Sequence, residues 1–166
     1  MILAATLLHL YPGLDLHAAV VLHDDGDGIV YIAQWHDPRP QPTPAELEAA
    51  WPEARRAQII AAIDAHANGL RETMTVGVTS AEMAAWAIKR AEALAYAGDP
   101  TACPMLAAEA AARGVPLAAI IERVLRNAAL LAAAEATIAG VAGRHKDAVR
   151  AAVDPAGYDW SQGWPL

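Results

Sequence analysis

The pattern of apolar and polar residues divides the chain into a short mixed segment and a longer helical one. Residues 2–10 are almost entirely apolar and are followed by a Pro-Gly pair, which predicts a short buried helix. Two runs of strand length, residues 18–22 and 29–35, are rich in β-branched and aromatic side chains. They flank a polar stretch, and this order predicts a helix followed by a β-hairpin.

The polar stretch between the predicted strands, residues 24–28, contains three aspartates and two glycines. Aligned as an EF-hand calcium loop with Gly28 at the sixth position, it would begin at His23 and close at Gln34, where a bidentate glutamate is required. Asp-Gly pairs also supply the positive φ of tight hairpin turns. We therefore favour a turn over a calcium site.

The next segment, residues 37–44, has proline at every second position. Proline fixes φ and lacks a backbone donor, so we expect an extended path without a strand ladder. We interpret this segment as a stiff linker between a module at residues 1–36 and a second domain. The alternative is a polyproline ligand for an aromatic groove on a partner.

Helix signals begin at the end of this linker. Thr43 and Glu46 form a Thr-x-x-Glu capping box, and the helix that it opens meets Pro52, which would restart or kink it. Thr79 and Glu82 form a second capping box, which predicts a helix up to about residue 96.

The later residues keep the helical spacing of large apolar side chains. Predicted helices cover residues 102–113 and 117–139. Gly140 and Gly143 are expected to end the longer helix before a last one at residues 144–152.

These elements predict an α+β protein, in which a small N-terminal helix and β-hairpin module precedes a mainly α-helical bundle domain. That domain would cover residues 45–153, and residues 154–166 would form a Trp-containing tail. The composition is 55% hydrophobic but only 5% aromatic, without Phe, and alanine provides most of the apolar fraction. We therefore expect closely packed helices, with Leu, Ile, Met and Trp as the bulky anchors.

Net charge and cysteine count narrow the classes of partner and compartment. A formal charge of -7 with scattered Lys and Arg disfavours a nucleic-acid partner. Residues 128–143 are shorter than the roughly 18 apolar residues of a membrane span, and residues 1–8 lack the basic start of a signal peptide. Cys103 is the single cysteine, so no intrachain disulfide forms. We expect cytoplasmic synthesis and no membrane partner.

Motifs that carry chemistry are missing from the sequence. The six histidines show no metal-ligand spacing, and there is no phosphate loop, dinucleotide fingerprint or nucleophile elbow. We predict no catalytic residues, no bound metal and no cofactor. A metal-dependent hydrolase that gathers dispersed His and Asp by long-range convergence is the weakest alternative.

Tryptophan is the residue type most enriched at binding hot spots, and here it lies at the ends of predicted elements or in the tail. We predict partner binding by Trp35, Trp51, Trp86, Trp160 and Trp164. For the first three, filling gaps in an alanine-rich core is an equal alternative. The two in the tail could instead dock back onto the domain.

Several motifs in about the first fifty residues resemble the XkdW-like phage tail protein family. They are residues 1–3, 10–12, 24–28, 31–35 and 40–47. The resemblance implies a helix and a small hairpin before a Pro-Thr-x-x-Glu-Leu helix start, and it carries no catalytic residues. The remainder resembles the alanine-rich helical domain that follows such modules in phage and prophage tail proteins, through residues 56–60, 86–94 and 159–165.

Members of this family are encoded beside tail-fibre genes, which implies a role close to the fibre. The leading hypothesis is a non-enzymatic tail-fibre-associated protein that assists fibre folding, assembly or attachment by binding a fibre or baseplate protein. The second is a structural virion subunit that acts as a tail or baseplate adaptor. The expected location is the host bacterial cytoplasm during assembly, or the virion tail for an adaptor, and a homo-oligomer is compatible with both.

Overall fold

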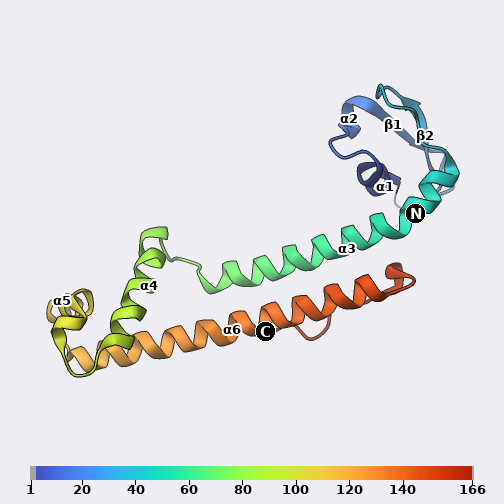
Figure 1. Ribbon diagram of the computed structural model, residues 1–166. Helices are drawn as coiled ribbons and strands as arrows, with labels where there is room; N and C mark the ends of the chain where they lie inside the picture. The colour runs from blue at the N-terminus through green and yellow to red at the C-terminus, as the bar shows by residue number, and fades with distance from the viewer. Residues whose placement is uncertain (1–2, 166) are drawn as a thin grey trace. The chain divides into compact units, whose positions relative to one another are not determined.

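The computed structural model describes residues 3–165 (Figure 1). Helices dominate this part of the chain, and a two-stranded sheet lies near its start, which confirms the predicted α+β class. The elements are α1 (Leu3–Leu10), α2 (Leu16–Ala19), β1 (Val20–Asp24), β2 (Val30–Trp35), α3 (Pro44–Met74), α4 (Ser80–Ala95), η1 (Pro100–Ala102), α5 (Pro104–Arg113), α6 (Leu117–Ala151) and η2 (Pro155–Gly157).

The predicted hairpin is present, but its first strand begins later than expected. Residues 16–19 form the short helix α2, because the Oδ1 atom of Asp15 accepts hydrogen bonds from the N–H groups of His17 (3.0 Å) and Ala18 (3.2 Å). β1 then pairs with β2 in antiparallel register, with Val20 opposite Trp35. This local capping by a single aspartate was not recognised in the sequence.

The predicted break at Gly140 and Gly143 is wrong, because α6 continues through both glycines to Ala151. A glycine inside a helix costs only about 1 kcal/mol, which the burial of apolar side chains in the adjoining turns offsets. Ile138 and Val149, on either side of the glycines, are both buried. α3 likewise continues through Pro52, and Figure 1 shows its first turns bent relative to the rest.

The described chain forms two compact units. Unit 1 contains residues 3–66 and 142–162, and unit 2 contains residues 67–141 and 163–165. These units divide the chain elsewhere than at the predicted linker. The physical reason is that Leu47, at the start of α3, is buried in the same apolar cluster as α1 and the hairpin.

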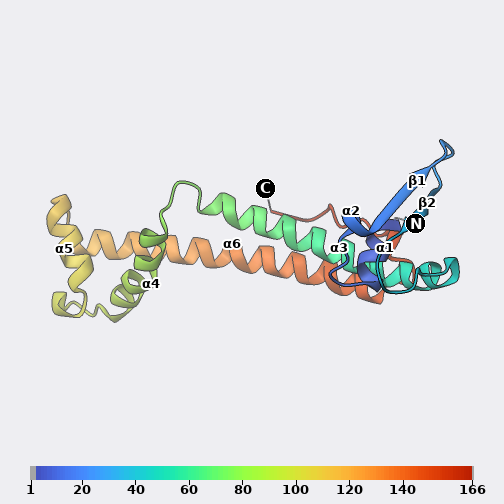
Figure 2. The same ribbon diagram turned by 90° about the horizontal axis from the view of Figure 1, so that it is seen from above.

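The core of unit 1 has two parts. Around the hairpin, the buried cluster consists of Leu3, Leu7, Leu14, Val20 and Leu47. Beyond it, α3 lies beside the last turns of α6 in both ribbon views (Figures 1 and 2). Lys146 Nζ and Asp64 Oδ1 form an ion pair of 2.8 Å between these helices, and Arg56 Nη2 donates to the carbonyl of Ala152 at 2.7 Å.

Unit 2 has its own apolar cluster around α4, α5 and the start of α6. Its buried members are Ala93, Cys103, Leu106, Ala110, Ile120 and Ile121. The carboxylate of Glu92 on α4 accepts from the N–H groups of Met105 (3.1 Å) and Leu106 (2.9 Å), which satisfies donors at the start of α5. Burial raises the pKa of the Cys103 thiol, so this cysteine belongs to the core.

The helices also fall short of membrane spans. Over residues 3–165, none is both long enough and apolar enough to cross a bilayer.

Candidate partner-binding surfaces

The aspartates of the hairpin loop stabilise a turn, as predicted. Gly26 and Gly28 have φ values of +96° and +80°, which are strained for residues with a side chain. Asp24 Oδ1 accepts from the N–H groups of both glycines, at 2.8 and 3.1 Å. Asp27 Oδ1 accepts from the N–H of Ile29 at 2.8 Å. Within residues 3–165, no three His, Cys, Asp or Glu side chains gather in a metal-binding arrangement.

The hairpin exposes several large apolar side chains. Ile29 is 67% exposed, and Val30, Tyr31 and Val21 are 44%, 42% and 42% exposed. Val30 and Tyr31 are consecutive in β2 and point to opposite faces, so the exposed apolar side chains are spread over both faces of the hairpin. Exposed apolar surface with a polar rim is typical of interaction sites.

A cavity of about 330 Å³ lies next to this exposed surface. We call it the edge groove, and it is lined by Leu3, Val30, Tyr31, Ile32, Gln41, Pro42, Pro44, Leu47 and Glu48. Consecutive side chains of a strand point to opposite faces, so a cavity lined by three consecutive residues of β2 runs along the strand edge. The facing wall comes from the proline-rich segment and the start of α3.

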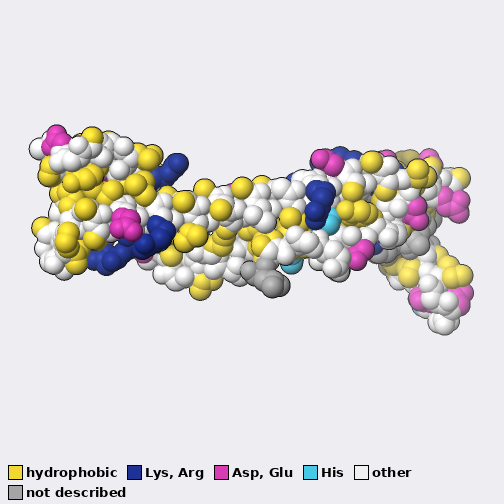
Figure 3. Space-filling view, turned by 90° about the horizontal axis from the view of Figure 1, so that it is seen from below, with side chains coloured by type: hydrophobic (Ala, Val, Ile, Leu, Met, Phe, Trp, Pro, Cys, Tyr) yellow, Lys and Arg dark blue, Asp and Glu magenta, His cyan; other side chains and the backbone are white. Residues whose placement is uncertain are grey.

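The part of the sequence that supplies the lining of the edge groove is strongly acidic. Residues 1–50 contain seven acidic residues and one arginine, a net charge of -6 out of the -7 of the whole chain. Glu48 lines the groove, and Asp25 at the hairpin loop is 67% exposed at its side chain. Figure 3 shows hydrophobic and acidic side chains together on the hairpin, at the lower right. The surface is therefore apolar with an acidic rim.

The proline-rich segment is held against the hairpin by aromatic residues. Trp35 Nε1 donates to the carbonyl of Arg39 at 2.7 Å, and the hydroxyl of Tyr11 donates to the carbonyl of Pro40 at 2.8 Å. The rings of Tyr11 and Trp35 lie 5.5 Å apart, and Pro42 is buried. Trp35 thus has an intrachain role, and its binding to a partner stays a prediction.

A charged pair strengthens the same attachment. The guanidinium of Arg39 binds the Asp37 carboxylate through two hydrogen bonds of 2.6 and 2.8 Å, and it stacks over the Tyr11 ring at 4.8 Å. These hydrogen bonds from Arg39 lower the pKa of Asp37 to about 2. The only arginine of the first fifty residues is therefore neutralised locally, and the rim stays acidic.

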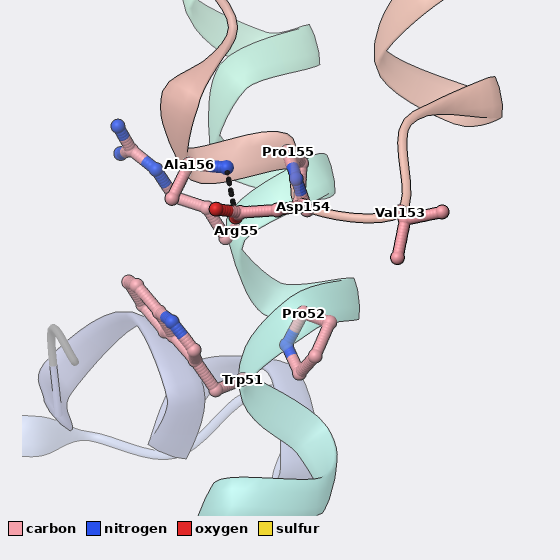
Figure 4. Close-up of a pocket in the computed structure, with 7 residues that line it drawn as sticks. All are labelled: Trp51, Pro52, Arg55, Val153, Asp154, Pro155 and Ala156. Atoms are coloured by element: carbon pink, nitrogen blue, oxygen red, sulfur yellow. Dashed lines mark hydrogen bonds between the residues drawn. The ribbon is translucent and has the colours of Figure 1, made fainter.

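Trp51 forms one wall of a second, smaller cavity of about 250 Å³. Figure 4 shows Trp51 and Pro52 of α3 facing residues 153–156 across it, where Asp154 accepts from the N–H of Ala156 at 2.9 Å. Its volume lies below the roughly 300–1,000 Å³ of typical ligand pockets. Trp51 therefore lines a small cavity, and its binding to a partner stays a prediction.

The tail returns to unit 1 and is held by two histidines. The ring of Trp160 meets that of His66 at 5.8 Å. Nε2 of the buried His145 lies 2.9 Å from the Gln162 carbonyl, and its Nδ1 lies 2.8 Å from the Tyr158 hydroxyl. Because a carbonyl only accepts, Nε2 carries a hydrogen and donates to Gln162, while Nδ1 and the Tyr158 hydroxyl share a second hydrogen bond. The docking-back alternative thus describes Trp160 in this structure.

The predicted tryptophans do not form one site. Trp51 contributes to the second cavity, and Trp160 contacts His66. Trp51 and His66 are fifteen residues apart on α3, or about 22 Å along its axis. Trp86 and Trp164 are half-buried in unit 2. The edge groove was missed in the sequence, although the apolar run at residues 29–32, without polar alternation, was a signal for it.

Comparison with protein families identifies this region. The XkdW protein family model matches residues 3–59, which include α1, the hairpin, the proline-rich segment and the first half of α3. Residues 3–59 form an XkdW-like module. The resemblance seen in the motifs is therefore confirmed for this module, which matches a phage-associated family over about a third of the chain. No curated protein and no solved structure matches the chain. The edge groove lies wholly within the XkdW-like module.

Proposed function

We propose that the chain is a non-enzymatic, tail-fibre-associated protein that binds a fibre or baseplate protein through its XkdW-like module and assists fibre folding, assembly or attachment. The observation that supports this most is the exposed apolar surface of the hairpin, with Ile29 at 67% exposure, beside the edge groove. A chaperone needs such a surface, because it must shield apolar segments of a chain that has not yet assembled. Action in the host cytoplasm during assembly is part of this proposal.

Co-expression with a phage tail-fibre protein tests the chaperone role. The soluble, trimeric fraction of the fibre should rise when the full chain is present and fall back without it. A matched pair of variants locates the effect. Ile29→Asp removes the most exposed apolar side chain of the hairpin, whereas Val76→Asp changes a side chain of 79% exposure in unit 2. Ile29→Asp should abolish the gain and Val76→Asp should keep it. Unchanged fibre solubility with or without the chain would reject the chaperone role.

A structural adaptor of the tail or baseplate is the second candidate. It is favoured by α3, a single helix of 31 residues that begins in the XkdW-like module and contributes residues to both units. Such a helix links a surface for one partner to a separate compact unit. Mass spectrometry of purified particles separates the candidates, since stoichiometric presence in the virion tail supports the adaptor and absence supports the chaperone.

A further inference from the structure

The outer edge of β2 is unpaired in the described part of the chain. Its sheet consists of β1 and β2 alone over residues 3–165, so the backbone N–H and C=O groups on the far side of β2 face no third strand. Such an edge is a template for another extended chain. The irregularity in the pairing falls at Ala33, so Val30–Ile32 keep regular strand geometry.

The walls of the edge groove suit a strand rather than a helix or a polar ligand. Pro42 and Pro44 lack backbone N–H donors, so the wall opposite β2 offers little competition for the hydrogen bonds of an entering backbone. Leu3 and Leu47 are buried at 5% and 7% exposure and form an apolar floor. A strand that adds here would place every second side chain against this floor.

Charge decides between the candidate occupants. A second copy of the chain would bring a second net charge of -6 to the same place, and each pair of like charges at 4 Å is unfavourable by about 1 kcal/mol even in bulk water. A partner segment with Lys or Arg beside its apolar residues gains from the same field. Glu48 in the groove is an exposed carboxylate available for such residues. Asp25 at the hairpin loop already contacts the side chains of His23 (3.1 Å) and Tyr31 (3.3 Å) and adds to the negative field.

We infer that an extended segment of the partner protein, apolar at alternate positions and flanked by Lys or Arg, adds to the outer edge of β2 as a third strand. This rests on the proposed function, because it specifies which part of a fibre or baseplate protein the XkdW-like module holds. The backbone provides affinity, the groove accepts alternate side chains, and the acidic rim selects the flanking residues.

The test uses the ¹⁵N-labelled full chain and a synthetic peptide of alternating Val and Thr with Lys at both ends. Amide hydrogen exchange of Val30–Ile32 should slow at least about tenfold when this peptide is present. The same peptide with Glu at both ends should leave exchange unchanged. Binding of the Lys peptide should weaken as salt rises toward 1 M, where the Debye length falls to about 3 Å.

Two valines of the hairpin provide matched variants. Val30 lines the edge groove and is 44% exposed, whereas Val21 lies on β1 outside the groove and is 42% exposed. Val30→Lys should weaken binding of the Lys peptide at least about tenfold, and Val21→Lys by less than about twofold. Circular dichroism of both variants should match the unaltered chain.

Three results would overturn the inference: no protection of β2 by the Lys peptide, equal protection by both peptides, or equal weakening by Val30→Lys and Val21→Lys. The amides of β2 could also become protected without peptide as the protein concentration rises. This result would identify a second copy of the chain as the occupant and would also overturn the inference. The co-expression experiment is independent of these. If the fibre depends on the chain while β2 stays unprotected, this inference fails and the proposed function stands, and the reverse result rejects only the function.

Discussion

Single side chains fix the proline-rich segment of the XkdW-like module to the hairpin, and the Asp37–Arg39 pair is the most specific of them. The Asp37 side chain is only 11% exposed, and both of its oxygens accept from the guanidinium. Sequence alone suggested a stiff linker between two modules, because alternate prolines indicate an extended path and do not reveal which residues lie beside it. The contacts of Tyr11 and Trp35 with the carbonyls of this segment depend on tertiary packing.

The pH dependence of this pair can be predicted in sign. Hydrogen bonds from Arg39 lower the pKa of Asp37 from 3.8 to about 2, so the pair contributes fully above pH 3.8 and is lost as the pH falls through about 2. Asp37→Asn should reduce the free energy of unfolding by the same amount from pH 7 to about pH 4, and by less toward pH 2. Urea denaturation at several pH values measures this.

A double-mutant cycle provides the control for this prediction. Arg39→Gln should destabilise the chain at neutral pH, and combining it with Asp37→Asn should add little, because both changes break one interaction. Additive losses in the double variant would show that the two residues do not act as a pair.

Two glycines should respond to the same substitution with opposite signs. Gly140 lies inside α6, and a methyl group added there would meet no side chain within 4 Å. Gly140→Ala should therefore raise the free energy of unfolding by about 0.5–1 kcal/mol. Gly114 ends α5 in the left-handed region at φ +64°, and Gly114→Ala should lower it by about 1–2 kcal/mol. Thermal denaturation of both variants measures these changes. If both variants changed the free energy of unfolding in the same direction, the assignment of α6 as one helix would be contradicted.

At the scale of elements, helix boundaries that rest on local signals were predictable, including the ends near residues 96 and 113. The capping boxes at Thr43 and Thr79 rest on contacts three residues apart, and both are present: Glu46 Oε2 accepts from the Thr43 N–H at 2.7 Å, and the Glu82 N–H donates to Thr79 Oγ1 at 3.2 Å. The hairpin and its turn were predicted for the same reason. Whether Gly143 ends a helix depends on what is buried around it, and this information is not local.

The return of the tail to unit 1 shows the same limit. Tyr158 and Gln162 meet His145 across sequence separations of 13 and 17, and Trp160 meets His66 from the far end of the chain. No spacing rule links these residues. The exposed surface of the hairpin could not be predicted from the sequence for a similar reason. An apolar run is typical of a buried strand, and whether it is buried depends on the size of the core that the fold provides.

The contribution of the tail attachment to stability can be measured by removing a single hydroxyl group. Tyr158→Phe removes the hydroxyl that contacts Nδ1 of His145, a buried side chain at 4% exposure. Losing a hydrogen bond to a buried group costs roughly 1–3 kcal/mol, so the free energy of unfolding should fall by that amount. Amide exchange over residues 155–162 should also become faster.

Tyr96→Phe is the matched control for the tail, because the Tyr96 ring packs against the core of unit 2. It should leave exchange in residues 155–162 unchanged. Equal effects of the two variants would indicate that the Tyr158 hydroxyl does not hold the tail.

For the whole molecule, the distribution of charge separates two kinds of surface. Residues 67–141 contain seven acidic and six basic residues, so unit 2 is nearly neutral, whereas residues 1–50 are strongly acidic. Unit 2 also exposes large apolar side chains, including Leu94 at 64% and Leu130 at 65%. Association between copies is therefore opposed by charge at the XkdW-like module and unopposed at unit 2.

We accordingly expect self-association through unit 2 at high protein concentration. Sedimentation velocity of the full chain should show a larger species that diminishes in Leu94→Lys and in Leu130→Lys. Val30→Lys, a similar change in the XkdW-like module, should leave it unaffected. A single monomeric species for the unaltered chain at every concentration would reject this expectation.

Unit 1 is assembled from both ends of the described chain, residues 3–66 and 142–162. A genetic crossover or a cloning cut just after the matched residues 3–59 therefore does not deliver an independently folding piece. It would separate the hairpin from the α6 turns and uncover side chains such as Ile59, which is 3% exposed in the intact chain. Exchange of this module between phages should thus require that residues 142–162, which complete unit 1, be exchanged together with it.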